Sequence, residues 1–300
     1  MPKFLQFASI TKKVTLAIIG LFLLMFLVVH LGINLCMLRE DGGAWFKAAA
    51  HFMGTNYIVK TFEIVLFAAI ILHIILAVLI QIHNWRARPV GYAVRTKSKT
   101  APASKLMIWS GILIALFMGV HFVNFYFAKV GLVEGCYVVE IKAIEEAFQD
   151  KQKTLNTAFA EAETEEAKAA VQAEMQAFQA GLQTLQANEK VGVALQNASD
   201  MENLTKAEVD EIRTALDVEY EPDFYFMARQ LFKNIWVVIL YVACMIALGF
   251  HLTHAFQSAF QTLGLAHSKY TPTIKLIGTL FAVVVAVGFA IIPLFFYFFK

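Results

Sequence analysis

The chain has 300 residues, 59% of them hydrophobic and 16% charged, with a mean hydropathy of +0.61. This composition lies outside the range of soluble proteins and favours a protein that spans a bilayer. The net charge is only +2, yet residues 134–223 hold 20 of the 23 acidic residues, which gives them a local charge of −13 and leaves +15 elsewhere. The chain therefore joins a basic membrane part to one acidic segment.

Five apolar runs are long enough to cross a bilayer as helices, which takes about 20 residues each. The runs cover residues 14–38, 58–83, 106–128, 231–260 and 274–299. The first is not a cleaved signal peptide, because its apolar stretch is too long and no small-residue cleavage site follows it. We predict an all-α fold, a five-helix transmembrane bundle (helices I–III in 1–132, IV–V in 223–300) with an inserted extracytoplasmic helical segment (133–222).

Basic residues gather in three of the segments that flank these runs. They are Lys3, Lys12 and Lys13 before the first run, Arg86, Arg88, Arg95, Lys97, Lys99 and Lys105 after the second, and Lys269 and Lys275 after the fourth. The positive-inside rule makes these three segments cytoplasmic. In a bacterial cytoplasmic membrane the N-terminus is then inside, and the C-terminus and the acidic insert are extracytoplasmic.

The acidic insert is rich in Ala, Glu, Gln and Lys, which are strong helix formers. We expect a break near residues 181–192, and Thr205 with Glu208 predicts a capping box that opens a further helix. We interpret the insert as a helical hairpin or small helical cap. It carries no metal, nucleotide or catalytic motif, so a structural extension and a partner-docking role both stay open.

The three cysteines form no motif for covalent haem attachment. Cys36, Cys136 and Cys244 give neither CxxC nor CxxCH, so a c-type haem is unsupported. Cys36 and Cys136 are both predicted on the outer side, so the sequence permits a disulfide between them without requiring it.

Four of the eight histidines lie inside four apolar runs, far from the basic residue at which each run begins. They are His30, 17 residues after Lys13; His121, 16 after Lys105; His73, 13 after Lys60; and His251, 18 after Lys233. At about 1.5 Å per residue each lies roughly 20–27 Å along its helix, in a hydrocarbon core about 30 Å thick. His30 and His121 are thus predicted near the outer side, and His73 and His251 near the inner side.

Two imidazoles at one depth on two helices can bind one haem iron from opposite faces. The alternative is four histidines that form hydrogen bonds between helices. Zinc or copper fits less well, because no nearby Cys, Asp or Glu completes a ligand set at either depth. We predict His30 and His121 as axial ligands of an outer haem b, and His73 and His251 as those of an inner haem b.

Four segments carry a family resemblance: residues 20–30 (GLFLLMFLVVH), 51–56 (HFMGTN), 86–89 (RARP) and 251–264 (HLTHAFQSAFQTLG). They resemble the di-haem cytochrome b anchor of succinate:quinone oxidoreductases (succinate dehydrogenase and fumarate reductase), in its Bacteroidetes-type, single-subunit form. The resemblance covers 1–132 and 223–300, whereas related subunits have only a short loop in place of the acidic insert. It implies the same four axial ligands. It favours His251, 13 residues before Gly264, over His254, which would lie beside the inner haem.

The resemblance implies a membrane anchor for a flavoprotein subunit and an iron–sulfur subunit in the respiratory chain and the tricarboxylic acid cycle. Electrons would pass between the iron–sulfur subunit and menaquinone through two b haems. The chain has no dinucleotide fingerprint, P-loop, cysteine cluster motif or hydrolase triad, so we expect no dicarboxylate site and no nucleic-acid partner. The direction of the reaction and a dimer of the whole complex stay open.

Further candidate residues lie near the two membrane surfaces. Glu63 is the only acidic residue inside an apolar run, and with His51 it is a candidate for quinone and proton exchange at the outer side. An interfacial carboxylate and an ordinary surface histidine are the alternatives. Six residues predicted near the inner side are candidates for haem propionates or, equally, headgroup anchors: His254, His83, Arg86, Arg88, Lys12 and Ser9.

Two rival functions stay open. One is the di-haem subunit of a formate dehydrogenase or hydrogenase, although the spacing in the first and fourth runs argues against it. The other is a haem-free membrane transporter with histidine proton relays, which a spectrum without b-type bands would favour.

Overall fold

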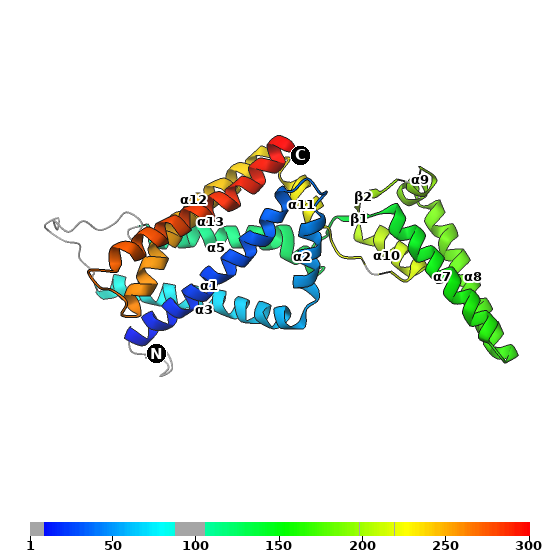
Figure 1. Ribbon diagram of the computed structural model, residues 1–300, viewed down its shortest axis with the longest axis horizontal. Helices are drawn as coiled ribbons and strands as arrows, with labels where there is room; N and C mark the ends of the chain where they lie inside the picture. The colour runs from blue at the N-terminus through cyan, green and yellow to red at the C-terminus, as the bar shows by residue number, and fades with distance from the viewer. Residues whose placement is uncertain (1–8, 88–105, 198, 219) are drawn as a thin grey trace. The chain divides into compact units, whose positions relative to one another are not determined.

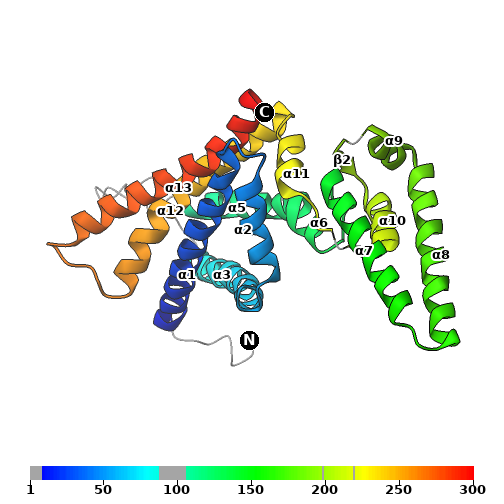
Figure 2. The same cartoon turned by 45° about the vertical axis from the view of Figure 1, so that its right-hand side comes forward.

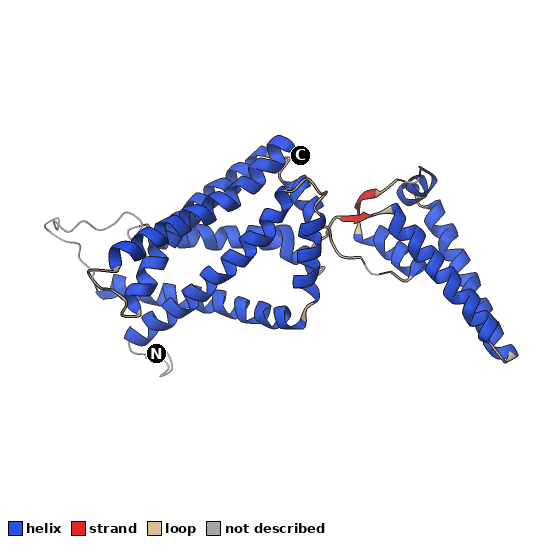
Figure 3. Cartoon of the chain, in the orientation of Figure 1, coloured by secondary structure: helices blue, strands red, loops and turns tan. Residues whose placement is uncertain are grey.

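A computed structural model describes residues 9–87, 106–197, 199–218 and 220–300, which are largely helical (Figures 1 and 3). Five of the described helical segments are long and apolar enough to cross a membrane, which confirms the predicted number. They are Ile10–Leu38, Tyr57–Ala87, Met107–Lys129, Ile235–Thr262 and Thr271–Phe299. The chain is thus an all-α, multi-pass membrane protein that lies in a lipid bilayer.

The chain divides into two compact units. The membrane unit combines Met1–Gly119 with Leu231–Lys300, and the insert unit comprises Val120–Gln230. The insert unit thus begins before and ends after the acidic insert predicted at 133–222. As a result, His121 belongs to the insert unit, whereas the other three predicted axial ligands belong to the membrane unit.

The membrane unit is built on five long helices. They are α1 (Ser9–Leu35), α3 (Tyr57–Ala87), α5 (Met107–His121, which continues into the insert unit), α12 (Ile235–Thr262) and α13 (Thr271–Phe299). Helices α12 and α13 form an antiparallel hairpin and lie side by side in both views, and α1 packs against both (Figures 1 and 2). Leu24 and Leu31 of α1 meet Leu252, Ala282 and Val285 in their shared core. The faces of these helices that leave large apolar side chains exposed fit contact with lipid tails.

Glycines bring α13 close to its neighbours. A Cβ added to Gly278 would lie 2.7 Å from Cδ1 of Phe256 on α12, and one added to Gly288 would lie 2.9 Å from both Cδ atoms of Leu31 on α1. Small residues permit such approach, and in lipid the gain is close van der Waals packing. Gly288 therefore lets α13 pack closely on α1 at Leu31, next to His30. Gly278 lets it pack closely on α12 at Phe256, five residues after His251.

Gly278→Ala is expected to destabilise the membrane unit by about 1–3 kcal/mol, because the new methyl group would press on a ring already held by Phe260 and Phe281. Gly20→Ala is the matched control, since a Cβ at Gly20 meets nothing within 4 Å. Both substitutions raise the helix propensity equally, so the difference in stability between the two variants reports packing alone. Thermal unfolding in detergent, followed by circular dichroism, measures the two midpoints. Equal midpoints would contradict the close packing of Gly278 on Phe256.

A short helix that the sequence analysis did not predict, α2 (Ala44–Thr55), precedes α3. The carboxylate of Asp41 accepts hydrogen bonds from the backbone N–H groups of Gly43 (3.0 Å) and Trp45 (3.4 Å), which holds the start of the helix. The guanidinium of Arg39 also lies over the Trp45 ring, with its Cζ 4.5 Å from the ring centroid. His51 therefore lies on this helix.

The insert unit contains the predicted helical hairpin, formed by α7 (Ile141–Glu161) and α8 (Glu165–Ala187), followed by α9 (Glu189–Asn197) and α10 (Lys206–Leu216). Strands β1 (Tyr137–Val139) and β2 (Met201–Leu204) pair antiparallel, with Tyr137 opposite Leu204 (Figure 3). This small sheet was not predicted. The helix break lies at Asn188, because α8 continues through Gly181 and Gly192 lies inside α9.

The predicted capping box at the start of α10 is confirmed. The Thr205 hydroxyl accepts from the Glu208 N–H, and the Glu208 carboxylate accepts from the Thr205 N–H at 2.7 Å. Burial alone would raise the pKa of Glu208, but hydrogen bonds from Thr205 and Lys190 outweigh it, so the pKa lies below its usual value. The capped helix buries Val209, Ile212 and Leu216 in the core of the unit.

A last short helix, α11 (Phe224–Leu231), precedes the fourth span. Its first turn is capped by Asp223, whose carboxylate accepts from the Phe226 N–H at 2.9 Å. The span itself, α12, begins at Ile235, where Asn234 accepts from the Trp236 N–H. The predicted fourth helix, 231–260, therefore begins four residues too early, because a second capping residue restarts the helix.

Candidate functional site

The structure brings His73 of α3 and His251 of α12 together. Their ring centroids lie 6.4 Å apart and the ring planes make an angle of 63°. These are the two histidines that counting along the helices predicted at one depth on the inner side. The juxtaposition is a property of the folded chain; the role of the two rings as haem ligands stays a prediction.

A third helix, α5, contacts this pair through Ser110 and Gly111. The Ser110 Oγ lies 3.3 Å from Nδ1 of His251 and donates to the Met107 carbonyl at 3.0 Å. A Cβ added to Gly111 would lie 3.5 Å from Cε1 of the same ring, an ordinary van der Waals contact. The His251 ring is therefore held by α5 on one side and faces His73 of α3 on the other.

The arrangement of these two rings fits a bis-histidine metal site. Two imidazoles that bind one ion, each at about 2.0–2.1 Å, hold their ring centroids roughly 6 Å apart, close to the observed separation. Within the described residues, Nδ1 of His73 is buried without a hydrogen-bond partner. The separation of the two rings matches a pair that holds a haem, whereas the buried Nδ1 of His73 is the ring nitrogen opposite the one that usually binds iron and would gain no partner from it.

The candidates for haem propionates are dispersed. His254 lies one helical turn beyond His251 on α12 and is half-buried, as is Lys12 on α1. His83 and Arg86 are exposed near the end of α3. Arg88 lies outside the described residues, and Ser9 begins α1 with a side chain that is not described. Their proposed role stays a prediction.

His30 has a different environment, near the end of α1. Its ring stacks on Phe26 at 5.1 Å and lies 5.6 Å from Phe289 of α13. Asn34 Nδ2 donates to the His30 carbonyl at 2.7 Å and lies 3.5 Å from Nδ1 of the ring. Helix α13, which has no histidine of its own, thus contributes an aromatic neighbour to His30.

His121 is the last residue of α5 and immediately precedes a π-helical turn, Phe122–Tyr126, after which α6 (Phe127–Lys129) completes the span. Its ring lies 5.3 Å from that of Phe125 within the turn. Such π-turns are rare and often occur at functional sites, because one extra residue redirects the side chains beside it. The sequence analysis did not predict this turn, and the apolar periodicity carries no signal for it.

The outer-side candidates lie on different helices. Glu63 is half-buried in α3, six residues after its first residue, Tyr57, whereas the His51 side chain is exposed on α2. Thr55 donates its hydroxyl to the His51 carbonyl at 2.8 Å, which leaves the imidazole uninvolved in that bond. A quinone or proton role for either residue stays a prediction.

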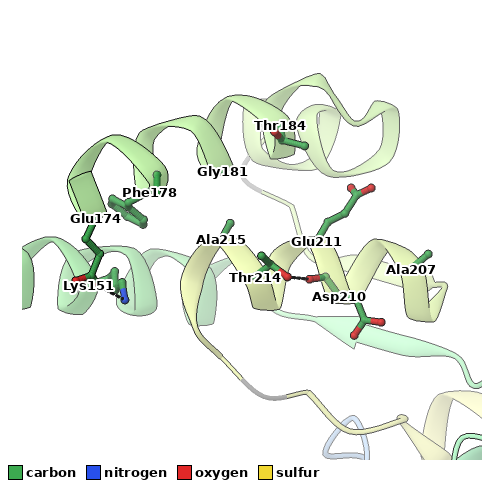
Figure 4. A pocket seen from close by; sticks show the side chains of 11 residues that line it. Lys151, Glu174, Phe178, Gly181, Thr184, Ala207, Asp210, Glu211, Thr214 and Ala215 are labelled. Atoms are coloured by element: carbon green, nitrogen blue, oxygen red, sulfur yellow. Dashed lines mark hydrogen bonds and ion pairs between the residues drawn. The ribbon is translucent and has the colours of Figure 1, made fainter. Parts of the chain in front are cut away.

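The insert unit contains an open groove of ≈ 660 Å³ between α8 and α10 (Figure 4). Its floor includes Phe178, Gly181 and Ala215, and Lys151 binds the Glu174 carboxylate at its edge at 3.1 Å. In the described parts of the chain, no group of three or more His, Cys, Asp or Glu side chains could hold a metal ion. The described lining of the groove therefore holds no such metal-binding group.

Cys36, Cys136 and Cys244 are free thiols in the structure, and Cys36 and Cys136 belong to different units. Burial, together with the charges of Glu134 and Asp223, raises the pKa of the Cys136 thiol and keeps it protonated at neutral pH.

The chain was also compared with family models, curated proteins and solved structures. No family model, no curated protein and no solved structure matches it.

Proposed function

We propose that this chain is the membrane anchor and di-haem cytochrome b subunit of a succinate:quinone oxidoreductase. The observation that carries the proposal is the His73–His251 pair, with two imidazoles from different membrane helices at a separation suited to one iron. The sequence segments that resemble the family supply the identity of the complex, and the rings supply the reason to expect haem.

The inner haem would be held by His73 and His251, and the outer haem by His30 and His121. Haem b supplies one-electron chemistry when it is bound between two histidines. The protein's part is to fix the imidazoles and to surround them with apolar side chains that exclude water. Phe26 of α1 and Phe289 of α13 do this for His30.

The two ends of the proposed electron path follow from charge and from the resemblance. The basic segments would lie in the cytoplasm, where the iron–sulfur and flavoprotein subunits dock. Menaquinone would bind near the outer side, close to Glu63 of α3. With this orientation, electron transfer between quinone and the iron–sulfur subunit crosses the membrane, and the protein lies in a bacterial cytoplasmic membrane.

The test is a reduced-minus-oxidised spectrum of the purified full-length protein, with haem quantified per chain. We expect b-type bands and two haems. A spectrum without them would contradict the proposal and favour a haem-free transporter. Reduction of the haems by formate or hydrogen, but not by succinate, in membranes that contain the native complex would instead favour the rival respiratory complexes.

A further inference from the structure

Ser110 of α5 is a buried hydroxyl at the His73–His251 pair. It keeps only 7% of its accessible surface, and its Oγ contacts two groups, the Met107 carbonyl at 3.0 Å and Nδ1 of His251 at 3.3 Å. A serine hydroxyl has one proton to donate and lone pairs to accept with. The hydroxyl is placed to donate to the Met107 carbonyl, which can only accept and which also hydrogen-bonds the His251 ring.

The remaining contact then fixes the proton of the imidazole. A hydroxyl that donates to Met107 leaves its oxygen to accept from His251, and the Met107 carbonyl accepts from the same ring, so the arrangement favours a hydrogen on Nδ1 of His251. In neutral imidazole this leaves the lone pair on Nε2, the nitrogen available to a metal. The hydrogen bond also restricts rotation of the ring, and Gly111 leaves room for the ring to lie close to α5.

The partner ring lacks such a bond. Among the described residues, Nδ1 of His73 is buried without a hydrogen-bond partner. The pair is therefore asymmetric, with one imidazole tied to α5 and the other held only by packing. Hydrogen bonds from the second nitrogen of a ligating histidine orient the ring and raise its basicity as a ligand.

We propose that Ser110 is a positioning residue, which fixes the Nδ1–H tautomer and the ring orientation of His251 and thereby lowers the reduction potential of the haem that His251 and His73 hold. The inference rests on the proposed function, because it needs a haem at this pair. It adds a residue of a third helix, α5, that acts on the iron through His251. A more basic ligand stabilises the oxidised iron, so removal of the hydroxyl favours the reduced form.

The experiment is a potentiometric titration of Ser110→Ala in the full-length holoprotein. The ratio of reduced to oxidised inner haem at a fixed potential should rise about tenfold, which corresponds to about 59 mV for a one-electron couple. The other haem should keep its potential. The inner haem is identified beforehand as the one that His73→Ala and His251→Ala remove. Electron paramagnetic resonance of the oxidised haem adds a readout of ring orientation.

Thr253→Val is the matched control. The Thr253 hydroxyl also bonds a helix carbonyl, that of Gly249 at 2.8 Å, and it lies two residues from His251, but it makes no bond to the ring. Ser110→Thr retains the hydroxyl and should restore the wild-type potential. Loss of the inner haem in Ser110→Ala, with both haems kept in Ser110→Thr and Thr253→Val, also supports the proposal.

Three results would overturn the assignment of Ser110. They are unchanged potentials in Ser110→Ala, an equal shift in Thr253→Val, and a Ser110→Thr variant that behaves like Ser110→Ala. Each of these leaves the proposed function standing, since the wild-type protein would still bind two b haems. A wild-type protein without haem would instead refute the proposed function, and with it the role of Ser110.

Discussion

His73→Ala and His251→Ala are each expected to remove the same single haem, and the haem content of the purified protein should fall from two per chain to one. The two rings lie 6.4 Å apart on different helices, so either substitution would leave a haem proposed to bind there with only one histidine to hold it. Without the inner haem, electrons from the iron–sulfur subunit should no longer reach the quinone. Haem quantification and succinate-dependent quinone reduction measure the two effects.

His267→Ala serves as the control, because His267 lies exposed in the turn between α12 and α13 and contacts neither ring. It should keep both haems. On depth alone, His30→Ala and His121→Ala should each remove the other haem. If His73→Ala and His251→Ala removed different haems, the pairing by depth would be wrong, although the protein could still be a di-haem cytochrome.

The proximity of His73 and His251 was predictable because depth in a membrane follows from sequence. A segment that crosses the bilayer must form its backbone hydrogen bonds within itself, so it is a helix with a fixed rise per residue. The length of the apolar run then gives the length of the helix, and the position of a residue in the run gives its depth. The five spans were predicted for the same reason. Likewise, the capping box at Thr205 was predictable because both of its partners lie within one helical turn.

Contacts between segments distant in the chain were not predictable in this way. Strand β1 pairs with β2 across some sixty residues, and neither three- to four-residue segment has a distinctive pattern of its own. Helix α2 depends on one carboxylate, Asp41, in a short loop. The contact of Ser110 with His251 joins residues 141 positions apart, and a serine in an apolar run has no periodicity that marks its partner.

The π-turn after His121 shows a further limit of prediction from pattern. The turn inserts a residue into the span without interrupting the apolar run, so the hydropathy of the span gives no sign of it. The break in the insert, by contrast, lies within the predicted range 181–192, at Asn188, whose side chain accepts from the Lys190 N–H at 3.2 Å.

Glu63→Gln is expected to reduce quinone turnover by about 100-fold or more while both haems stay bound, because proton transfer by a positioned side chain contributes about 10²–10⁴-fold. Glutamine has nearly the same size and can form hydrogen bonds, but it cannot take up or release the proton that a quinone exchanges. Glu63 precedes His73 by ten residues on α3, or about 15 Å along the helix. The substitution should therefore leave the inner pair intact.

The measurement that separates these roles is quinol oxidation or quinone reduction, set against the reduction of the haems by dithionite. Glu40→Gln is the matched control. Glu40 is an exposed carboxylate in the short loop before α2, and its substitution removes the same charge from the chain. Slow quinone turnover in Glu63→Gln alone, with a normal haem spectrum, places proton exchange at Glu63. Normal turnover in Glu63→Gln would remove this residue from the quinone site and leave its half-buried carboxylate a structural feature of α3.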